Sequence, residues 1–321
     1  MEENRIVMIT KNSHWDSANP FITVVTPVFN RIDILPRAIR SIEEQTFRDF
    51  EYIIINDGST QNLDEVVVPF MNQTDIPVMY IKKENGGVHT ARNAGVREAR
   101  GFLITWLDSD DEFMPETLDV IKKAWDQIPS DKADEYFQIS SRCMDENGQA
   151  GTEFPDNINT LEMKEAYAVY NKHKVENLLA NRADIMKANP WPEPEDITFV
   201  GEDVIWLELE QKYRTWFIND ILRVYHTEGT DHVFSSSKKK DLQYIKNCLW
   251  TLSYHLNHWK GGKFFDSFFK YELFMLIYRR SASGQVREDF LLRNPLYSVL
   301  MVVLFIPALF GSWIYESKKM K

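Results

Sequence analysis

Short apolar segments alternate with segments of helical periodicity along the first third of the chain, and this alternation constrains the fold more than any other feature. The apolar segments are rich in β-branched and aromatic residues, which is typical of buried strands. The segments between them place apolar residues at helical spacing, as at Leu35, Ala38, Ile39 and Ile42. The predicted strands, some with the turn that follows, are 21–29, 50–60, 77–87 and 101–111, and predicted helices are 31–46 and 89–99. Strands alternating with helices predict an α/β fold with a mainly parallel sheet and right-handed crossovers.

Polar clusters follow three of the predicted strands at the point where each strand ends. They are Asn30, the Asn56-Asp57-Gly58 turn and the Asp108-Ser109-Asp110 turn. In open parallel sheets ligands bind beyond the carboxyl ends of the strands, where the strand order reverses. The recurrence of the clusters therefore predicts a ligand site at that edge of the sheet.

The last of these clusters belongs to the sequence WLDSDDEF, which gathers four carboxylates within five residues directly after an apolar run. Such a segment is either a solvated turn or a site for a cation. Mg²⁺ and Mn²⁺ prefer oxygen ligands, and they need only one or two protein carboxylates when phosphate oxygens complete the shell. We interpret Asp108 and Asp110 as candidates for holding such an ion, which would neutralise a diphosphate leaving group.

Length and composition limit the remaining possibilities. The chain of 321 residues suits one large domain or one domain with an appendage, and an apolar content of 44% supports a packed core. Cys143 and Cys248 form no C-x-x-C or Cys/His cluster, which argues against a zinc site or a disulfide framework and fits a reducing compartment. The N-terminus lacks the pattern of a signal peptide, so we expect a cytoplasmic protein body.

The C-terminal part differs from the rest in charge and in hydropathy. From Lys238 onward the chain has 14 Lys and Arg against 6 Asp and Glu, whereas the preceding residues have 23 and 42. An acidic body makes nucleic-acid binding improbable, and a basic tail predicts contact with an anionic membrane surface. The uncharged segment 295–315 is long enough to cross a bilayer, although Pro307 and Gly311 also allow a helix lying in one leaflet. A buried helix of a soluble core is the alternative.

We therefore divide the chain into three parts, with the boundary between body and tail in the charged turn Ser235 to Asp241. An N-terminal extension covers residues 1–20, a catalytic domain covers 21–235, and an aromatic, basic, helical tail covers 236–321. His255 and His258 lie three residues apart in this tail and could hold a metal, but an interfacial role suits an aromatic helix better.

Five motifs in order, namely VVTPVFNR, YIIINDGST, ENGGVHTARNAG, WLDSDDEF and FVGEDVIW, resemble those of family 2 glycosyltransferases of the GT-A fold. The resemblance covers residues 20 to about 235 and excludes the tail. It implies inverting transfer of a sugar from a nucleotide-sugar, usually a UDP-sugar, to a hydroxyl, by a hexosyl- or N-acetylhexosaminyltransferase that uses Mn²⁺ or Mg²⁺.

The resemblance also implies roles for individual residues on the donor side. Phe29 would stack on the base, Asp108 would contact the ribose or the metal, and Asp110 would be the principal metal ligand. His226 would lie near the diphosphate or the metal. The remaining residues implied to bind the nucleotide-sugar are Thr26, Pro27, Asn56, Asp57, Gly86, Gly87, Arg92 and Asn93.

On the acceptor side, the resemblance assigns the catalytic base to the segment GEDVIW. Inverting displacement needs one base that removes the proton of the acceptor hydroxyl as it attacks. Asp203 would be this base, and Glu202 and Trp206 would orient the acceptor or the sugar. Without the resemblance, Glu202 and Asp203 are simply acids near a helix start.

We accordingly expect a non-processive enzyme on the cytoplasmic face of the inner membrane, peripheral or anchored by its tail. A membrane-held tail suggests a lipid or a polyprenyl-diphosphate-linked glycan as the acceptor. Two alternatives remain open. One is a non-catalytic membrane scaffold that keeps the sugar-nucleotide fold, and the other is a nucleotidyltransferase, which TPVFNRID disfavours because it has no glycine for a triphosphate loop. The sequence does not identify the sugar, the linkage or the oligomeric state.

Overall fold

A computed structural model describes residues 6–170, 176–227 and 242–258. These residues divide into two compact units, which are described separately. The first unit comprises the described residues of 6–191 and 209–227, and the second comprises 192–208 and 242–258. The predicted catalytic domain therefore contributes to both units.

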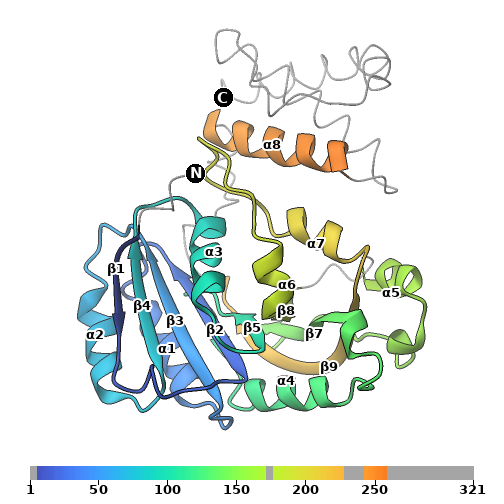
Figure 1. Ribbon diagram of the computed structural model, residues 1–321, viewed down its shortest axis with the longest axis horizontal. Coiled ribbons are helices and arrows are strands. Elements are labelled where there is room, and N and C mark those ends of the chain that lie inside the picture. Colours follow the sequence, from blue (N-terminus) through green and yellow to red (C-terminus); the bar gives the residue numbers. More distant parts are fainter. Residues whose placement is uncertain (1–5, 171–175, 228–241, 259–321) are drawn as a thin grey trace. The chain divides into compact units, whose positions relative to one another are not determined.

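The described residues form a nine-stranded sheet in the order β1-β4-β3-β2-β5-β8-β7-β9-β6 (Figure 1). The strands are β1 (Ile6–Lys11), β2 (Ile22–Val28), β3 (Phe50–Asp57), β4 (Val78–Lys83), β5 (Leu103–Trp106), β6 (Glu112–Phe113), β7 (Tyr136–Asp145), β8 (Asn177–Arg182) and β9 (Arg214–Tyr225). The helices of the first unit are α1 (Leu35–Glu43), α2 (Asp64–Gln73), α3 (Val88–Glu98), α4 (Thr117–Asp126), α5 (Met163–Tyr170) and α6 (Ala183–Ala188). Short 3-10 turns lie at Ala133–Glu135 and Ile158–Thr160.

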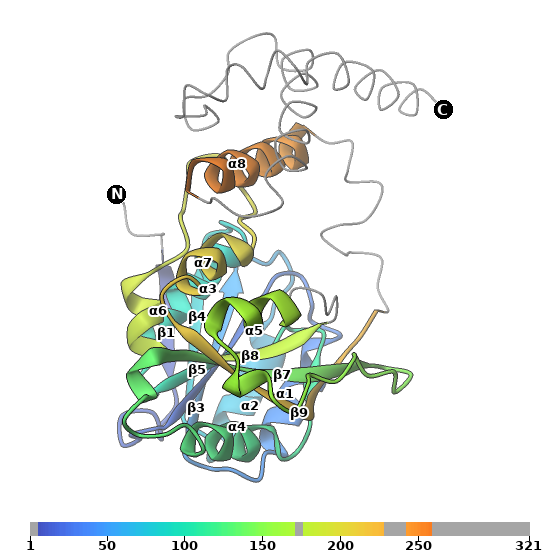
Figure 2. The same cartoon turned by 90° about the vertical axis from the view of Figure 1, so that its right-hand side faces the viewer.

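The centre of the sheet is parallel, as the alternation of strands and helices predicts. β2 pairs with β3 and β5, and β3 pairs with β4, all in parallel. Every residue of β2 and β3 is buried, because helices cover both faces of the sheet (Figure 2). The carboxyl ends of these strands therefore meet at one edge of the sheet, next to the reversal of strand order between β2 and β5.

The remainder of the sheet is mixed. β8 runs antiparallel to both β5 and β7, β7 and β9 are parallel, and the two-residue strand β6 returns antiparallel to β9. This pairing carries the end of β9 to the loop that follows β5. The α/β fold with flanking helices is confirmed, and the strands beyond β5 form its mixed half.

The two faces of the central strands bury different helices. On one face, α1, α2 and α4 contribute Leu35, Val67 and Leu118 to a cluster with alternate residues of β2 and β3. On the other face α3 lies close to the sheet, because a side chain at Gly95 would come within 2.5 Å of Val25. Gly95 thus sets how near this helix lies to β2.

β1 corrects the prediction that residues 1–20 lie outside the domain. Ile6–Lys11 forms an edge strand antiparallel to β4, and Val7 is 68% exposed. An edge strand exposed on both faces lacks the alternation or the continuous burial that marks a strand in a sequence. Trp15, which follows this strand, is buried, with the guanidinium of Arg100 4.1 Å from its ring centroid.

The second unit contains α7 (Asp203–Leu209, whose last residue is assigned to the first unit) and α8 (Leu242–His258). α7 begins at Asp203, which agrees with the helix start predicted near Glu202 and Asp203, and α8 is the helix at the start of the described tail. The predicted boundary at 235–241 and the apolar segment 295–315 lie outside the described residues. Within the described residues, no helix combines the length and apolarity needed to span a bilayer.

Candidate functional site

The acidic loop after β5 is balanced by arginines from several elements. Asp108 lies 3.4 Å from the Arg92 guanidinium of α3, and Asp110 lies 3.4 Å from that of Arg31 in the loop after β2. Arg37 of α1 also donates a hydrogen bond to the backbone carbonyl of Asp110. The Asp108 side chain is 42% exposed and that of Asp110 is 25% exposed. Both carboxylates can therefore be approached from solvent while partly neutralised.

The other two acids of the loop have structural partners. Asp111 is buried, lies 3.4 Å from the Arg223 guanidinium and accepts a hydrogen bond from the backbone N–H of His226. Burial raises the pKa of Asp111 to about 7, although Arg223 opposes this shift. Glu112 lies 2.9 Å from Nε2 of His226. These contacts fasten the end of β9 to the acidic loop.

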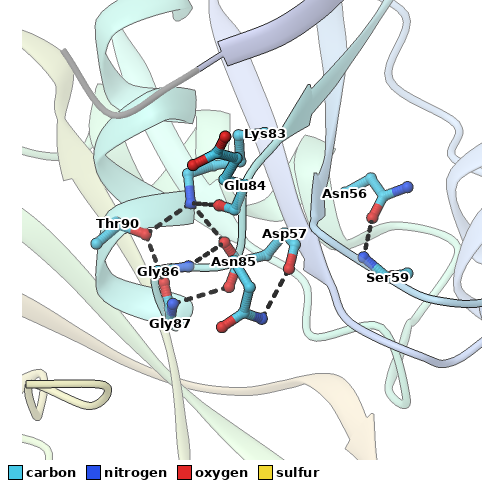
Figure 3. A network of polar contacts seen from close by, with 9 residues as sticks. All are labelled: Asn56, Asp57, Ser59, Lys83, Glu84, Asn85, Gly86, Gly87 and Thr90. Atoms are coloured by element: carbon cyan, nitrogen blue, oxygen red, sulfur yellow. Dashed lines mark hydrogen bonds and ion pairs between the residues drawn. The ribbon is translucent and has the colours of Figure 1, made fainter. Parts of the chain in front are cut away.

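A polar network holds the loops after β3 and β4 together (Figure 3). Asp57 accepts hydrogen bonds from the backbone N–H groups of Gly86 and Gly87 and forms an ion pair of 2.5 Å with Lys83. The Lys83 ammonium also donates to the carbonyl of Glu84 and the hydroxyl of Thr90, which uses all three of its protons. The structure thus gives Asp57 the role of fixing the glycine turn, and its predicted contact with a base stays a prediction.

The two glycines of this turn are required by its geometry. Gly87 has a φ of 90° where α3 begins, which favours glycine. A Cβ on Gly86 would lie 2.6 Å from the hydroxyl oxygen of Thr90. The turn therefore favours residues without side chains at both positions, and the close approach of a ligand to it stays a prediction.

The residues at the ends of β2 and β3 differ in accessibility. Phe29 is 47% exposed, which excludes a core position and suits stacking on a flat ring. Thr26 and Pro27 are buried in β2, and the Thr26 hydroxyl accepts a hydrogen bond from Tyr52. Asn56 accepts from the backbone N–H of Ser59 and donates to the Tyr80 hydroxyl. Of these side chains, Phe29 is the exposed one, and its stacking on a base stays a prediction.

Asn93 and Arg92 are neighbours in α3, but their side chains have different contacts. Both polar groups of Asn93 bond to the backbone of Trp191, which gives this buried side chain a structural role. Its predicted nucleotide contact stays a prediction. Arg92 is also buried, but its guanidinium carbon lies 5.7 Å from the ring centroid of Trp106 and its NH2 group faces Asp108. Arg92 therefore links α3 to the exposed acid.

The predicted metal ligands are Asp108, Asp110 and His226, and their contacts show which of them suit a metal ion. Asp108 and Asp110 present oxygen atoms, which fit Mg²⁺ or Mn²⁺ when phosphate and water complete the shell. His226 is directed to Glu112, and no group of three or more His, Cys, Asp or Glu side chains suited to a metal occurs among the described residues. Asp108, Asp110 and His226 therefore do not form such a group among the described residues, and the metal-binding role of His226 stays a prediction. The two aspartates alone fit such an ion.

In the second unit, Asp203 begins α7 and its side chain is 60% exposed. One carboxylate oxygen, Oδ2, lies 3.5 Å from Nε2 of His255 in α8. A Cβ on Gly201 would lie 2.4 Å from the other oxygen, Oδ1. Glu202 is exposed and Trp206 is partly buried on the same short helix.

Sequence reasoning missed several of these residues. Arg31, Arg37 and Arg223 reach the acidic loop from distant positions, and of these three only Arg31 lies in a motif of the resemblance, where it was given no role. Lys83 ends a strand directly before the glycine turn, and its position next to a predicted ligand loop was the one available signal.

The chain is similar to glycosyltransferases both in sequence and in fold. Residues 23–164 match the model of the family described as glycosyl transferase family 2. An uncharacterized glycosyltransferase of Rickettsia bellii is 31% identical over 139 residues, and the match spans 37% of this chain but 20% of the relative. The chain thus covers a minor part of the first relatives that it matches.

One relative matches over a longer stretch. The GalNAc(5)-diNAcBac-PP-undecaprenol beta-1,3-glucosyltransferase of Campylobacter jejuni is 26% identical over 238 residues, which is 68% of this chain and 69% of the relative.

Among solved structures, S. aureus TarS 1-349 in complex with UDP-GlcNAc superposes with a TM-score of 0.55 at 18% identity, over 89% of this chain and 79% of that one. The mannosyltransferase PcManGT of Pyrobaculum calidifontis, in complex with GDP-Man and Mn²⁺, gives 0.53 at 14% identity, over 94% and 89%. These similarities show a shared GT-A fold.

Proposed function

We propose, from the match of residues 23–164 to the model of glycosyl transferase family 2, that the chain transfers a sugar from a nucleotide-sugar to an acceptor hydroxyl. The observation that carries the proposal is the pair of accessible carboxylates, Asp108 and Asp110, beyond the carboxyl end of β5. They lie in the part of an open parallel sheet where ligands bind.

For the donor we propose a UDP-sugar that carries a hexosyl or N-acetylhexosaminyl group. Phe29 offers an exposed ring for the base, and the Gly86-Gly87 turn offers backbone at the start of α3. Helix starts favour negative charge, which suits a diphosphate. The TarS complex with UDP-GlcNAc supports UDP-sugars as the first donors to test.

Asp108 and Asp110 would hold Mn²⁺ or Mg²⁺. When bound, the ion would supply charge neutralisation for the nucleoside diphosphate leaving group. Arg31 and Arg92 lie next to these carboxylates, and we propose that their guanidinium groups would also contact the phosphate oxygens of the donor. The PcManGT complex with Mn²⁺ supports the choice of ion.

Asp203 is the proposed base. It would accept the proton of the acceptor hydroxyl as that oxygen bonds to the anomeric carbon. The bond from the anomeric carbon to the phosphate oxygen breaks on the opposite side, its electron pair leaves with the nucleoside diphosphate, and the configuration inverts. Glu202 and Trp206 would orient the acceptor or the sugar.

For the acceptor we propose a membrane-associated glycan or lipid, and a location at the cytoplasmic face of the inner membrane. The support is the basic tail after Lys238 with its uncharged segment 295–315, together with the undecaprenol-linked substrate named for the C. jejuni relative. We also propose that the transfer is non-processive.

A thermal-shift titration of the full-length chain in detergent tests the donor site. We expect UDP-GlcNAc or UDP-glucose to raise the melting temperature when MnCl₂ is present, because a ligand that binds only the native state stabilises it. Asp110→Asn should abolish the part of the shift that depends on Mn²⁺. Asp131→Asn, at an exposed acid before β7, should keep it. Equal shifts with EDTA would contradict the role of the metal, and no shift with UDP or GDP compounds would contradict the donor site.

The catalytic step is tested by Asp203→Asn in a transfer assay with membrane extracts as the acceptor source. We expect the rate to fall at least a hundredfold, since general bases contribute about 10²–10⁴-fold. Undiminished transfer would refute this assignment. Donor binding without turnover by the wild-type chain would favour the scaffold alternative.

A further inference from the structure

α8 is fastened to the segment before and within α7 by hydrogen bonds along its length. Near its start, Gln243 donates to the backbone carbonyl of Asp196 at 2.8 Å. Asn247 accepts from the backbone N–H of Thr198 and donates to the hydroxyl of the same residue, both at 3.1 Å. Near its end, the Tyr254 hydroxyl donates to Glu208 at 2.6 Å. The first helix of the tail is therefore built onto the segment that carries the proposed base.

One contact in this set reaches the proposed base itself. Nε2 of His255 lies 3.5 Å from Oδ2 of Asp203, and the imidazole is 11% exposed whereas the carboxylate is 60% exposed. The carboxylate is thus accessible to solvent, whereas the imidazole beside it is nearly buried. Its other oxygen occupies the space that Gly201 leaves, since a Cβ there would come within 2.4 Å of Oδ1.

A carboxylate with a buried ring beside one of its oxygens has fewer orientations than a free one. A short aspartate at an exposed helix start otherwise rotates among several rotamers, and only some of them point a lone pair at the acceptor. Proton transfer requires the base to lie within hydrogen-bond reach of the hydroxyl in the reactive pose, so lost orientation lowers the rate of the chemical step. The contacts of Asp203 therefore bear on kcat more than on donor binding.

We propose that His255 is a positioning residue that holds the Asp203 carboxylate in its reactive orientation, within the space that the missing side chain of Gly201 leaves for Oδ1. This inference rests on the proposed role of Asp203 as the base. It also places the first tail helix within the catalytic machinery, so that the tail does more than attach the protein to a membrane. The alternative is that His255 only helps to attach α8, as Gln243 and Asn247 do. The two roles predict different effects of His255 variants on kcat.

Steady-state kinetics of the full-length chain separate them, measured as UDP released from UDP-GlcNAc or UDP-glucose with membrane extract as acceptor. We expect His255→Ala to lower kcat about ten- to a hundredfold, with the KM of the donor changed less than about twofold, since slight misplacement of a catalytic group can cost about a hundredfold. His255→Gln, which keeps an N–H donor, should recover part of kcat.

Tyr254→Phe is the matched control, because it removes the adjacent fastening to Glu208 without touching Asp203. Its kcat should stay within about twofold of the wild-type value if His255 acts by positioning the base. Equal losses in Tyr254→Phe and His255→Ala would overturn the proposal.

A double variant gives a sharper test. If His255 acts through Asp203, adding His255→Ala to Asp203→Asn should leave the residual rate unchanged, because the group to be positioned has gone. A further loss by the same factor as in the wild-type background would show a structural role and overturn the proposal. An unaffected Asp203→Asn variant would instead refute the proposed base, so the two failures are distinguishable.

A measurement without turnover completes the design. In the full-length chain labelled with ¹⁵N-histidine, the ring resonance of His255, assigned by its loss in His255→Gln, should shift in Asp203→Asn. It should stay in place in Arg182→Gln, which removes a charge from β8 of the other unit. If the His255 resonance did not shift in Asp203→Asn, the contact between the two side chains would be absent and the proposal would be overturned. This outcome does not depend on which donor the enzyme uses.

Discussion

Phe29 is the residue whose exposure most directly suggests a ligand contact, because a large aromatic side chain at the end of a buried strand is normally covered. Its ring is 47% exposed, whereas the seven residues before it in β2 are all buried. We expect Phe29→Ala to weaken UDP binding about five- to a hundredfold, since stacking of a base on an aromatic ring contributes about 1–3 kcal/mol. Isothermal titration with UDP measures this change.

Val68→Ala serves as the control for Phe29→Ala, because Val68 is another exposed apolar residue, 40% exposed on α2. Its UDP affinity should match that of the wild-type chain. If both variants bound UDP equally well, Phe29 would have no part in the donor site.

Single residues also mark the limit of what the sequence predicts. Asp108 and Asp110 were predicted as site residues from their own neighbourhood, because acids directly after an apolar strand are conspicuous. Arg223 lies more than a hundred positions further along the chain and reaches the acidic loop only because β6 pairs with β9. A contact of this kind follows from strand order, which the local pattern does not contain.

At the scale of elements, the turn between β4 and α3 depends on a buried ion pair, and this gives a stability prediction. The Lys83 and Asp57 side chains are 1% and 5% exposed. Lys83→Met leaves the Asp57 carboxylate buried with its backbone donors alone, so we expect it to lower the free energy of unfolding by about 3–5 kcal/mol. Urea denaturation followed by circular dichroism measures the loss.

The adjacent residue offers a control of identical chemistry. Lys82 forms an ion pair of the same length with Asp64, but its side chain is 25% exposed and that of Asp64 is 38% exposed. Lys82→Met should therefore cost about 0–1 kcal/mol, as is usual for surface pairs. Comparable losses in the two variants would show that burial of Asp57 does not govern the stability of the turn.

Elements with a strong pattern were predicted well, and those that depend on long-range pairing were not. β2, β3, β4 and β5 carry apolar runs that only a strand covered on both faces explains. β9 has a mixed burial pattern and twelve residues, and its position is decided by pairing with β7 and β6. The start of the tail was predicted to be helical, but the contact of α8 with Asp203 depends on two segments about fifty residues apart. Periodicity reports one element at a time, so it cannot reveal such contacts.

At the scale of the whole molecule, acidic charge exceeds basic charge, with a net value of −11, yet four acids near the candidate site, Asp57, Asp108, Asp110 and Asp111, are each paired with arginine or lysine. A donor carrying two phosphates would otherwise be repelled by an acidic body. The placement of a few cations, more than the net charge, therefore decides whether an anionic ligand can bind.

Whole-molecule stability should also depend on pH through Glu210, which lies between α7 and β9. Burial raises the pKa of this carboxyl from 4.5 to about 7 in the folded protein. Between these two values the unfolded chain has released the proton that the folded protein still holds, so folding stability falls as the pH rises from about 4.5 to 7. The full difference between the two pKa values corresponds to about 3 kcal/mol in the free energy of unfolding. Because the side chain is partly exposed, we expect a loss of about 1–3 kcal/mol.

Glu210→Gln removes this contribution, because an amide does not titrate. The variant should gain stability relative to the wild-type chain as the pH rises from 5 to 7.5, and the difference should level off above the folded pKa of about 7. Urea unfolding of both proteins at a series of pH values measures it. Glu162→Gln, at an exposed position, controls for the loss of one negative charge and should run parallel to the wild-type curve. If the Glu210→Gln curve were also parallel, the carboxyl would be solvated in the folded protein, and the segment that joins α7 to β9 would have to pack less tightly around it.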